Sequence, residues 1–150
     1  MTCLRLVKVL VFLTWPFIVQ AQETAAWNQF GGPHRNFHVE SVPLADTWPD
    51  GGPTRLWGRS LGEGYSSIVV DGGLLVTMYR DGDEEVVTAL DASTGSTLWR
   101  HVSRAPLVHN GYVDIWLNAS GPGPYSTPLI AGDAVFAVGI EGRFDSLNKR

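Results

Sequence analysis

Short apolar runs separated by turn residues dominate the chain from residue 66 to residue 101. Glycine with an aspartate or a threonine separates the runs, and such pairs favour tight turns. The runs are rich in β-branched and other apolar residues, which suit a pleated strand, and they cover residues 66–70, 74–79, 86–90 and 96–101. The pattern therefore predicts an all-β chain with an antiparallel meander of four strands.

The last hairpin of this meander has the sequence ALDASTGSTLW, residues 89–99. Asp91 can accept hydrogen bonds from backbone N–H groups that follow it, and Gly95 adopts a positive φ without steric cost. Trp99 is too large an apolar side chain to leave in water. We therefore expect Trp99 to be buried against a neighbouring element.

The meander has a second copy further along the chain. The stretch GEGYSSIVVDGGLLVTM starting at Gly62 aligns with GPGPYSTPLIAGDAVFAV starting at Gly121. At an offset of 60 residues, the register pairs Tyr65 with Tyr125, Ser66 with Ser126, Gly72 with Gly132 and Leu75 with Val135. Leu90 pairs with Leu147 at an offset of 57, because the middle hairpin of the first copy is longer. A repeat of this length with four strands per copy is typical of a β-propeller, in which each copy forms one blade.

The hairpin motif resembles the repeat motif of the pyrroloquinoline-quinone (PQQ) propeller family. The residues that carry this likeness are Ala89, Asp91, Thr94, Gly95 and Trp99. In that family the motif tryptophan docks against the neighbouring blade, which implies this structural role for Trp99. The stretch Trp27–Arg35 resembles the beginning of secreted PQQ-like propeller proteins.

The resemblance implies a partial β-propeller of about two four-stranded antiparallel blades. Leu56-Trp57 repeats Leu98-Trp99, as if residues 54–61 were an outer strand that closes the ring on the last blade. The implied organisation is an N-terminal segment outside the blades (22–53) followed by repeats (54–150), with a closing strand (54–61), a blade (62–101), an insertion (102–120) and an incomplete blade (121–150). A propeller needs at least four blades, so we expect an N-terminal fragment of a longer protein. The alternative is a small protein that completes its ring by oligomerising.

The first 21 residues have the features of a signal peptide. Arg5 and Lys8 precede an apolar stretch that runs to Val19. This stretch is shorter than the ~20 residues that a membrane span needs, and a proline interrupts it. We expect cleavage between Ala21 and Gln22, and a periplasmic or secreted product without a membrane anchor.

The remaining composition excludes several kinds of chemistry. Cys3 is the only cysteine and lies in the expected leader, so the mature chain has no disulfide, thiolate metal site or cysteine nucleophile. Without Arg5 and Lys8, nine basic residues stand against fifteen acidic ones. A net charge of −6 argues against nucleic acid as a partner. The acidic turn at residues 81–85 lacks the spacing of a calcium loop, and we expect it to be solvated.

These features favour a non-catalytic module for protein interaction or scaffolding, with a protein partner and no cofactor. It resembles the propeller component of the outer-membrane β-barrel assembly machinery. The alternative is the N-terminal part of a quinoprotein alcohol or sugar dehydrogenase, in which PQQ and Ca²⁺ lie on the propeller axis. Such enzymes typically have an adjacent cysteine pair, which is absent here. A third hypothesis is binding of a polysaccharide or another ligand by an extracellular propeller. The sequence predicts no catalytic, cofactor-binding or metal-binding residue.

Overall fold

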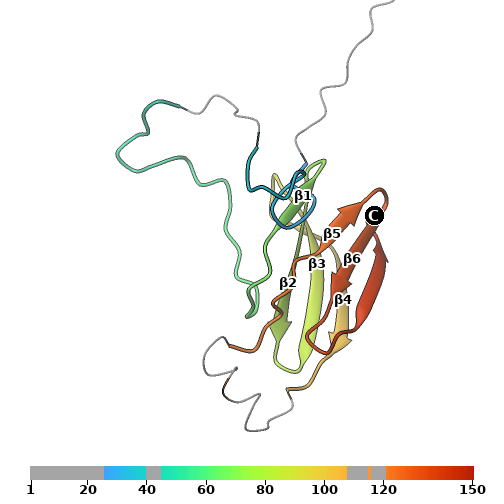
Figure 1. Cartoon of the computed structure of the whole chain (residues 1–150). Coiled ribbons are helices and arrows are strands. Elements are labelled where there is room, and N and C mark those ends of the chain that lie inside the picture. The colour runs from blue at the N-terminus through green and yellow to red at the C-terminus, as the bar shows by residue number, and fades with distance from the viewer. Residues whose placement is uncertain (1–25, 40–44, 108–114, 116–120) are drawn as a thin grey trace, which may run out of the picture.

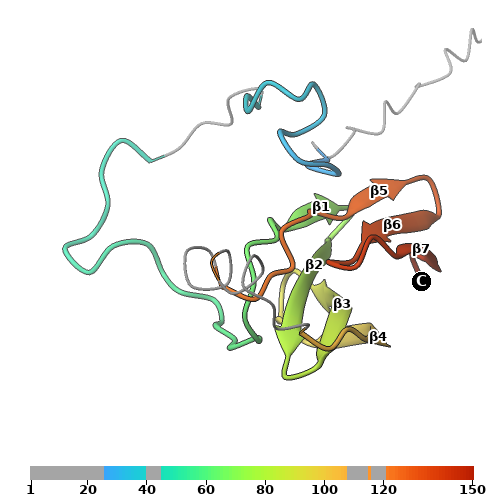
Figure 2. The same cartoon turned by 60° about the horizontal axis from the view of Figure 1, so that its bottom comes forward.

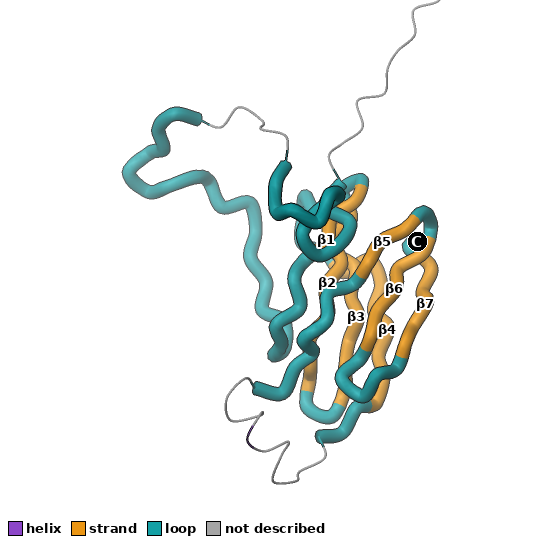
Figure 3. Tube along the Cα trace, viewed as in Figure 1, coloured by secondary structure: helices purple, strands orange, loops and turns teal. Residues whose placement is uncertain are grey.

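The computed structural model describes residues 26–39, 45–107, 115 and 121–150, and the elements with described bounds are seven β-strands (Figure 1, Figure 3). Sheet 1 contains β1 (Val69–Asp71), β2 (Leu74–Asp81), β3 (Glu84–Asp91) and β4 (Thr97–Arg104). Sheet 2 contains β5 (Leu129–Ala131), β6 (Ala134–Val138) and β7 (Phe144–Asn148). Each sheet is an antiparallel meander in chain order. The all-β class and the partial propeller are confirmed.

Two boundaries of the strands in sheet 1 differ from the sequence-based expectation by three residues, and the others differ by two residues or fewer. The first strand begins at Val69 rather than Ser66, because side chains take over the backbone hydrogen bonds there: the Met78 N–H donates to the Ser66 hydroxyl at 3.3 Å. The outer strand extends to Arg104 instead of ending at residue 101, because β3 begins at Glu84 and offers it pairing partners. The connection between the sheets therefore starts after Arg104.

The register of the two sheets confirms the internal repeat. Leu75 pairs with Leu90 in sheet 1, and Val135 pairs with Leu147 in sheet 2. The turns that follow are also equivalent, since the N–H of Ala92 donates to Gly73 and that of Lys149 donates to Asp133, both at 2.8 Å. Sheet 2 thus repeats sheet 1, except that no counterpart of β4 lies within the described residues.

The hydrophobic core lies between the two sheets. One face of sheet 1 packs against one face of sheet 2, and Trp99 and Leu147 border the core as half-buried side chains. The buried members are Val69, Leu74, Val76, Met78, Val87 and Ala89 from sheet 1 and Ile130, Val135 and Ala137 from sheet 2. Figure 2 shows the sheets as neighbouring blades, with the short strands β1 and β5 next to each other.

The sequence suggested that the N-terminal segment lies outside the blades, but two of its residues contact both sheets. The N–H of Val70 in β1 donates to the Trp27 carbonyl at 2.8 Å, and that of Ile130 in β5 donates to the Asn28 carbonyl at 2.8 Å. The Asn28 side chain returns a bond to the Ile130 carbonyl at 3.1 Å. Strands β1 and β5 have unpaired backbone groups on their outer edges. The two residues 27 and 28, which we call the clip, accept one backbone N–H group from each strand.

Residues 54–61, expected as a closing strand, form no strand. They run alongside sheet 1, and only Glu63 just beyond them bridges to Arg80 of β2. A strand needs a neighbour with which to exchange hydrogen bonds, and the described residues place none beside this segment. The expected leader with its Ala21–Gln22 cleavage point lies outside the described residues. Within the described ranges, no helix is long and apolar enough to cross a membrane.

Candidate interaction sites

The repeat-motif turn is held together by Asp91. One oxygen of its carboxylate accepts from the backbone N–H of Ser93 at 3.0 Å and of Thr94 at 2.8 Å, and from both hydroxyls at 2.6 and 2.9 Å. The Ser93 and Thr94 hydroxyls, followed by the Thr94 N–H, hold the pKa of Asp91 below its ordinary value of 3.8. The carboxylate is therefore committed to the turn as a charged acceptor.

Gly95 closes this turn under an indole ring. Its φ is +72°, and a Cβ added there would lie 2.6 Å from the Trp57 ring. The Trp57 indole N–H donates to the Ala92 carbonyl at 2.9 Å, and the Arg59 guanidinium donates to the Gly95 carbonyl at 2.8 Å. A side chain at position 95 would displace the ring, so the motif glycine is required twice, for its φ and for its small size.

Trp99 makes the equivalent contact with sheet 2. It stands opposite Ala89, which is fully buried, and its indole N–H donates to the Lys149 carbonyl at 3.0 Å. Lys149 is the counterpart of Ala92 in the repeat, because both follow the third strand of their sheet by one residue. Trp57 therefore relates to sheet 1 as Trp99 relates to sheet 2.

A groove of about 590 Å³ opens beside Trp99, where the turns of sheet 1 meet the end of β7. Leu98 and Trp99 supply its apolar surface, and the Lys149 ammonium forms an ion pair with the Asp71 carboxylate at its side. The acidic groups are thus engaged, Asp71 by this ion pair and Asp91 by its turn. No group of three or more metal-ligating side chains forms within the part of the chain that the structure describes. The groove suits docking better than acid–base chemistry.

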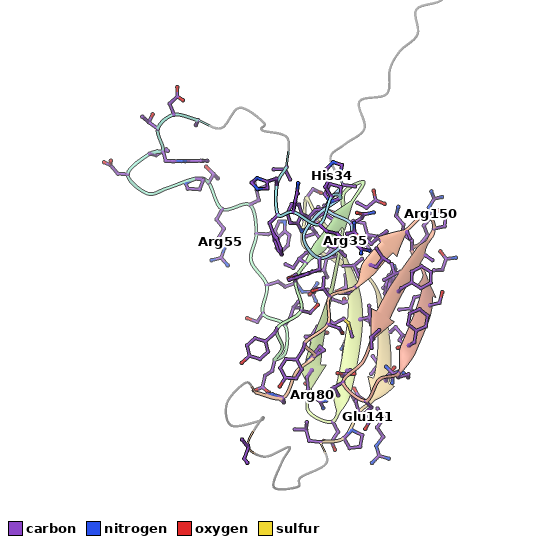
Figure 4. All side chains as sticks on the ribbon, viewed as in Figure 1. His34, Arg35, Arg55, Arg80, Glu141 and Arg150 are labelled. Carbon is purple, nitrogen blue, oxygen red and sulfur yellow. The ribbon has the colours of Figure 1, made fainter. Side chains whose placement is uncertain are left out.

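The opposite end of the sheets contains two buried charged residues that the sequence did not single out. Arg80 of β2 and Glu85 of β3 lie opposite each other in the strand register, and each is only 2% exposed. Arg80 donates to the Ala105 carbonyl at 2.6 Å and to the Pro122 carbonyl at 3.0 Å, so it fixes both ends of the connection between the sheets. Figure 4 shows Arg80 at the end of the molecule opposite to Arg150.

Glu85 corrects the expectation that the whole acidic turn is solvated. Residues 81–84 are exposed, but the Glu85 carboxylate accepts the backbone N–H of Ile140 at 3.0 Å with both oxygens. It thereby holds the β6–β7 turn of sheet 2 against sheet 1. Residue type alone does not distinguish Glu85 from the solvated acids beside it, because its partner lies 55 positions away.

Two exposed tyrosines stack at this same end. Tyr65 and Tyr125 are repeat counterparts, and their rings lie 5.7 Å apart with an interplanar angle of 11°. The N–H of Tyr65 donates to the Pro124 carbonyl at 2.9 Å, and the Tyr125 hydroxyl donates to the Gly121 carbonyl. The rings remain 61% and 47% exposed. Fixed backbone and exposed aromatic surface are typical of protein-contact sites.

Comparison with known families agrees with this architecture. Residues 45–150 match the family model described as outer membrane protein assembly factor BamB. The chain belongs to this PQQ-like β-propeller family. A search of curated proteins found no significant match.

Proposed function

We propose that the chain is an exported, non-catalytic propeller module that binds a protein partner through the tyrosine face, defined by Tyr65 and Tyr125. The observation that carries this proposal is the stacking of two repeat-equivalent, exposed rings on anchored backbone. Tyrosine presents a large amphipathic surface at low entropic cost, and it is enriched at protein interfaces. Each blade supplies one ring at the same position, so the face extends as blades are added.

The description of the matching family supports a role in protein contacts. The matching family model is described as an assembly factor, which is a role based on protein contacts. The buried charges also have structural partners: Arg80 fixes the connection between the sheets, and Glu85 fixes the β6–β7 turn. We therefore expect no saturable change in quinone absorbance when PQQ and Ca²⁺ are added. A one-to-one titration would overturn the non-catalytic assignment.

The leader expected at residues 1–21 supports export. We propose that the mature protein begins at Gln22 and acts in the periplasm or outside the cell. N-terminal sequencing of the product tests this directly. An intact Met1 in a membrane fraction would contradict it.

The contact role is tested by crosslinking in extracts of exported proteins, with Tyr65→Ser/Tyr125→Ser compared with Trp48→Ser. Trp48 is 54% exposed and lies outside both sheets, which makes it a matched aromatic control. We expect the double variant to lose the crosslinked partner, whereas the control retains it. The melting temperatures of all three proteins should agree, because the substituted rings are exposed. A partner retained by the double variant would place the contact elsewhere.

A further inference from the structure

The tyrosine face lies at an end of the two sheets that a neighbouring sheet leaves open. Sheets 1 and 2 pack face to face, so a neighbour covers the face of a sheet and not its ends. Tyr65 and Tyr125 precede the short strands β1 and β5, and their stacked rings are exposed. Within the described ranges, Arg100 lies over the Tyr79 ring, and no cation lies over either ring of the tyrosine face. Both rings therefore offer aromatic surface to a partner.

Side-chain contacts bring a turn of each sheet to this face. The Arg80 guanidinium donates to the Gly82 carbonyl at 3.1 Å and to the Pro122 carbonyl at 3.0 Å, so the β2–β3 turn and the segment before the second tyrosine share one anchor. A Cβ added at Gly123 would lie 3.1 Å from the Ile140 side chain and 3.2 Å from the ring of that tyrosine. The β6–β7 turn therefore reaches the face as well.

The acidic side chains at this end are exposed and outnumber the basic ones. We call five of them the acidic rim, and none takes part in an ion pair among the described residues: Glu63, Asp81, Asp83, Glu84 and Glu141. Figure 4 shows Glu141 at the same end of the molecule as Arg80. The buried Arg80 donates to carbonyl groups, Arg143 is engaged by Asp145, and Arg104 is the exposed base opposite Glu84. The end thus presents net negative charge beside the two rings.

We propose that the tyrosine face binds a basic segment of its partner, with lysine or arginine side chains over the rings and against the acidic rim. This inference rests on the proposed contact role of the two tyrosines and adds the chemistry of the partner. A cation within about 6 Å of a tyrosine ring centroid is attracted by the ring face. Ile140 is 38% exposed and adds apolar surface, which suits the aliphatic stems of such side chains. The acidic rim repels an acidic segment and so selects the partner by charge.

Titration with a labelled arginine–glycine peptide tests the charge of the site, with a glutamate–glycine peptide as the comparison. The rim variant neutralises three acids of the β2–β3 turn: Asp81→Asn, Asp83→Asn and Glu84→Gln. The control variant neutralises three exposed acids elsewhere: Asp46→Asn, Asp50→Asn and Asp133→Asn. We expect the rim variant to bind the basic peptide about tenfold more weakly than the control variant at low salt. Equal affinities of the two variants, or a parent that prefers the acidic peptide or binds neither, would overturn the proposal.

A second pair of variants tests the rings. Tyr65→Leu/Tyr125→Leu removes both aromatic faces and should weaken binding of the basic peptide about fivefold. Tyr65→Phe/Tyr125→Phe keeps the ring faces and should bind like the parent. Equal melting temperatures check that both proteins are folded. Equal affinities of the two double variants would contradict the contact between the cations and the rings.

The crosslinking assay in extracts of exported proteins separates this inference from the proposed function. We expect the rim variant to lose the crosslinked partner, as Tyr65→Ser/Tyr125→Ser does, and the control variant to retain it. A partner that the rim variant retains and the tyrosine variant loses would overturn the basic segment and leave the contact role standing. A partner retained by both would overturn the contact role as well.

Discussion

The two sheets have nearly the same pattern but very different burial. In sheet 1 the side chains of Val76, Met78 and Val87 are at most 3% exposed. Their counterparts in sheet 2 are Phe136, Val138 and Phe144, of which the last two are 41% and 64% exposed. The exposed set is no less apolar than the buried one. Burial in a repeat protein is therefore decided by whether a neighbouring sheet is present, because each repeat contacts only its neighbours.

The outer strands of the two sheets also differ, in the number of charged side chains along the edge. Strand β4 has Arg100, His101 and Arg104 along it, and the ladder beside it is irregular at Ala89/Leu90. Charges and bulges of this kind protect an edge from further pairing. Strand β7 has only one charged side chain, Asp145, whose carboxylate is engaged by the Arg143 guanidinium at 2.9 Å. The protected edge belongs to the sheet with four described strands, and the unprotected edge to the sheet with three.

The largest effect should come from the tryptophan that joins the two sheets. We expect Trp99→Ala to lower the free energy of unfolding by about 3 kcal/mol, near the lower end for a large aromatic, because Trp99 is half-buried against the core. Trp57→Ala should cost about half as much, since its indole covers a single turn. Urea denaturation of the three proteins measures both. A larger loss for Trp57→Ala would show that the N-terminal contact dominates.

A matched pair in the two sheets tests the role of the neighbour directly. Val87 and Phe144 are repeat counterparts, with exposures of 1% and 64%. We expect Val87→Ala to cost about 2 kcal/mol, whereas Phe144→Ala stays within about 0.5 kcal/mol, as for an exposed site. Thermal melts of dilute protein decide between them. Equal losses would mean that the open face of sheet 2 is covered in solution.

The sequence predicted those parts of the molecule that depend on local pattern. Glycine turns and short apolar runs predict the four strands of sheet 1. The repeat alignment of Leu75 with Val135 and of Leu90 with Leu147 is confirmed, because Leu75 pairs with Leu90 and Val135 pairs with Leu147. The clip at Trp27–Asn28 could not be predicted in this way, because two residues have no strand period. The partner of Glu85 could not be predicted either, because the N–H group that its carboxylate accepts lies far away in the sequence.

A smaller effect should separate backbone strain from packing at the turns. Gly72 has a φ of +56° with no atom within 4 Å of an added Cβ, while Gly95 lies under the Trp57 ring. We expect Gly72→Ala to cost about 1 kcal/mol through left-handed strain alone. Gly95→Ala should cost about 0.5 kcal/mol more, because the methyl group displaces the indole. The denaturant midpoints of the two variants measure this difference. Identical midpoints would contradict the contact between Gly95 and the Trp57 ring.

The smallest effect concerns the charge of the motif turn, and sheet 2 already contains the comparison. Asn148 is the counterpart of Asp91, and its side-chain oxygen accepts the N–H of Arg150 at 3.0 Å, as Asp91 accepts that of Ser93. Asp91→Asn should therefore keep the turn and change only its response to pH.

Because the pKa of Asp91 is lowered by folding, its charge stabilises the folded state above the ordinary value of 3.8. This contribution is lost as the pH falls from 3.8 through the lowered pKa of the folded state. In Asp91→Asn the acid side of the stability curve should consequently be flatter, with little change near neutral pH. Urea titrations at pH 3 to 7 measure both proteins, and parallel acid slopes would mean that the Asp91 carboxylate is not ionised differently in the two states. Asn148→Asp should steepen the same slope if the turns of the two sheets are electrostatically equivalent.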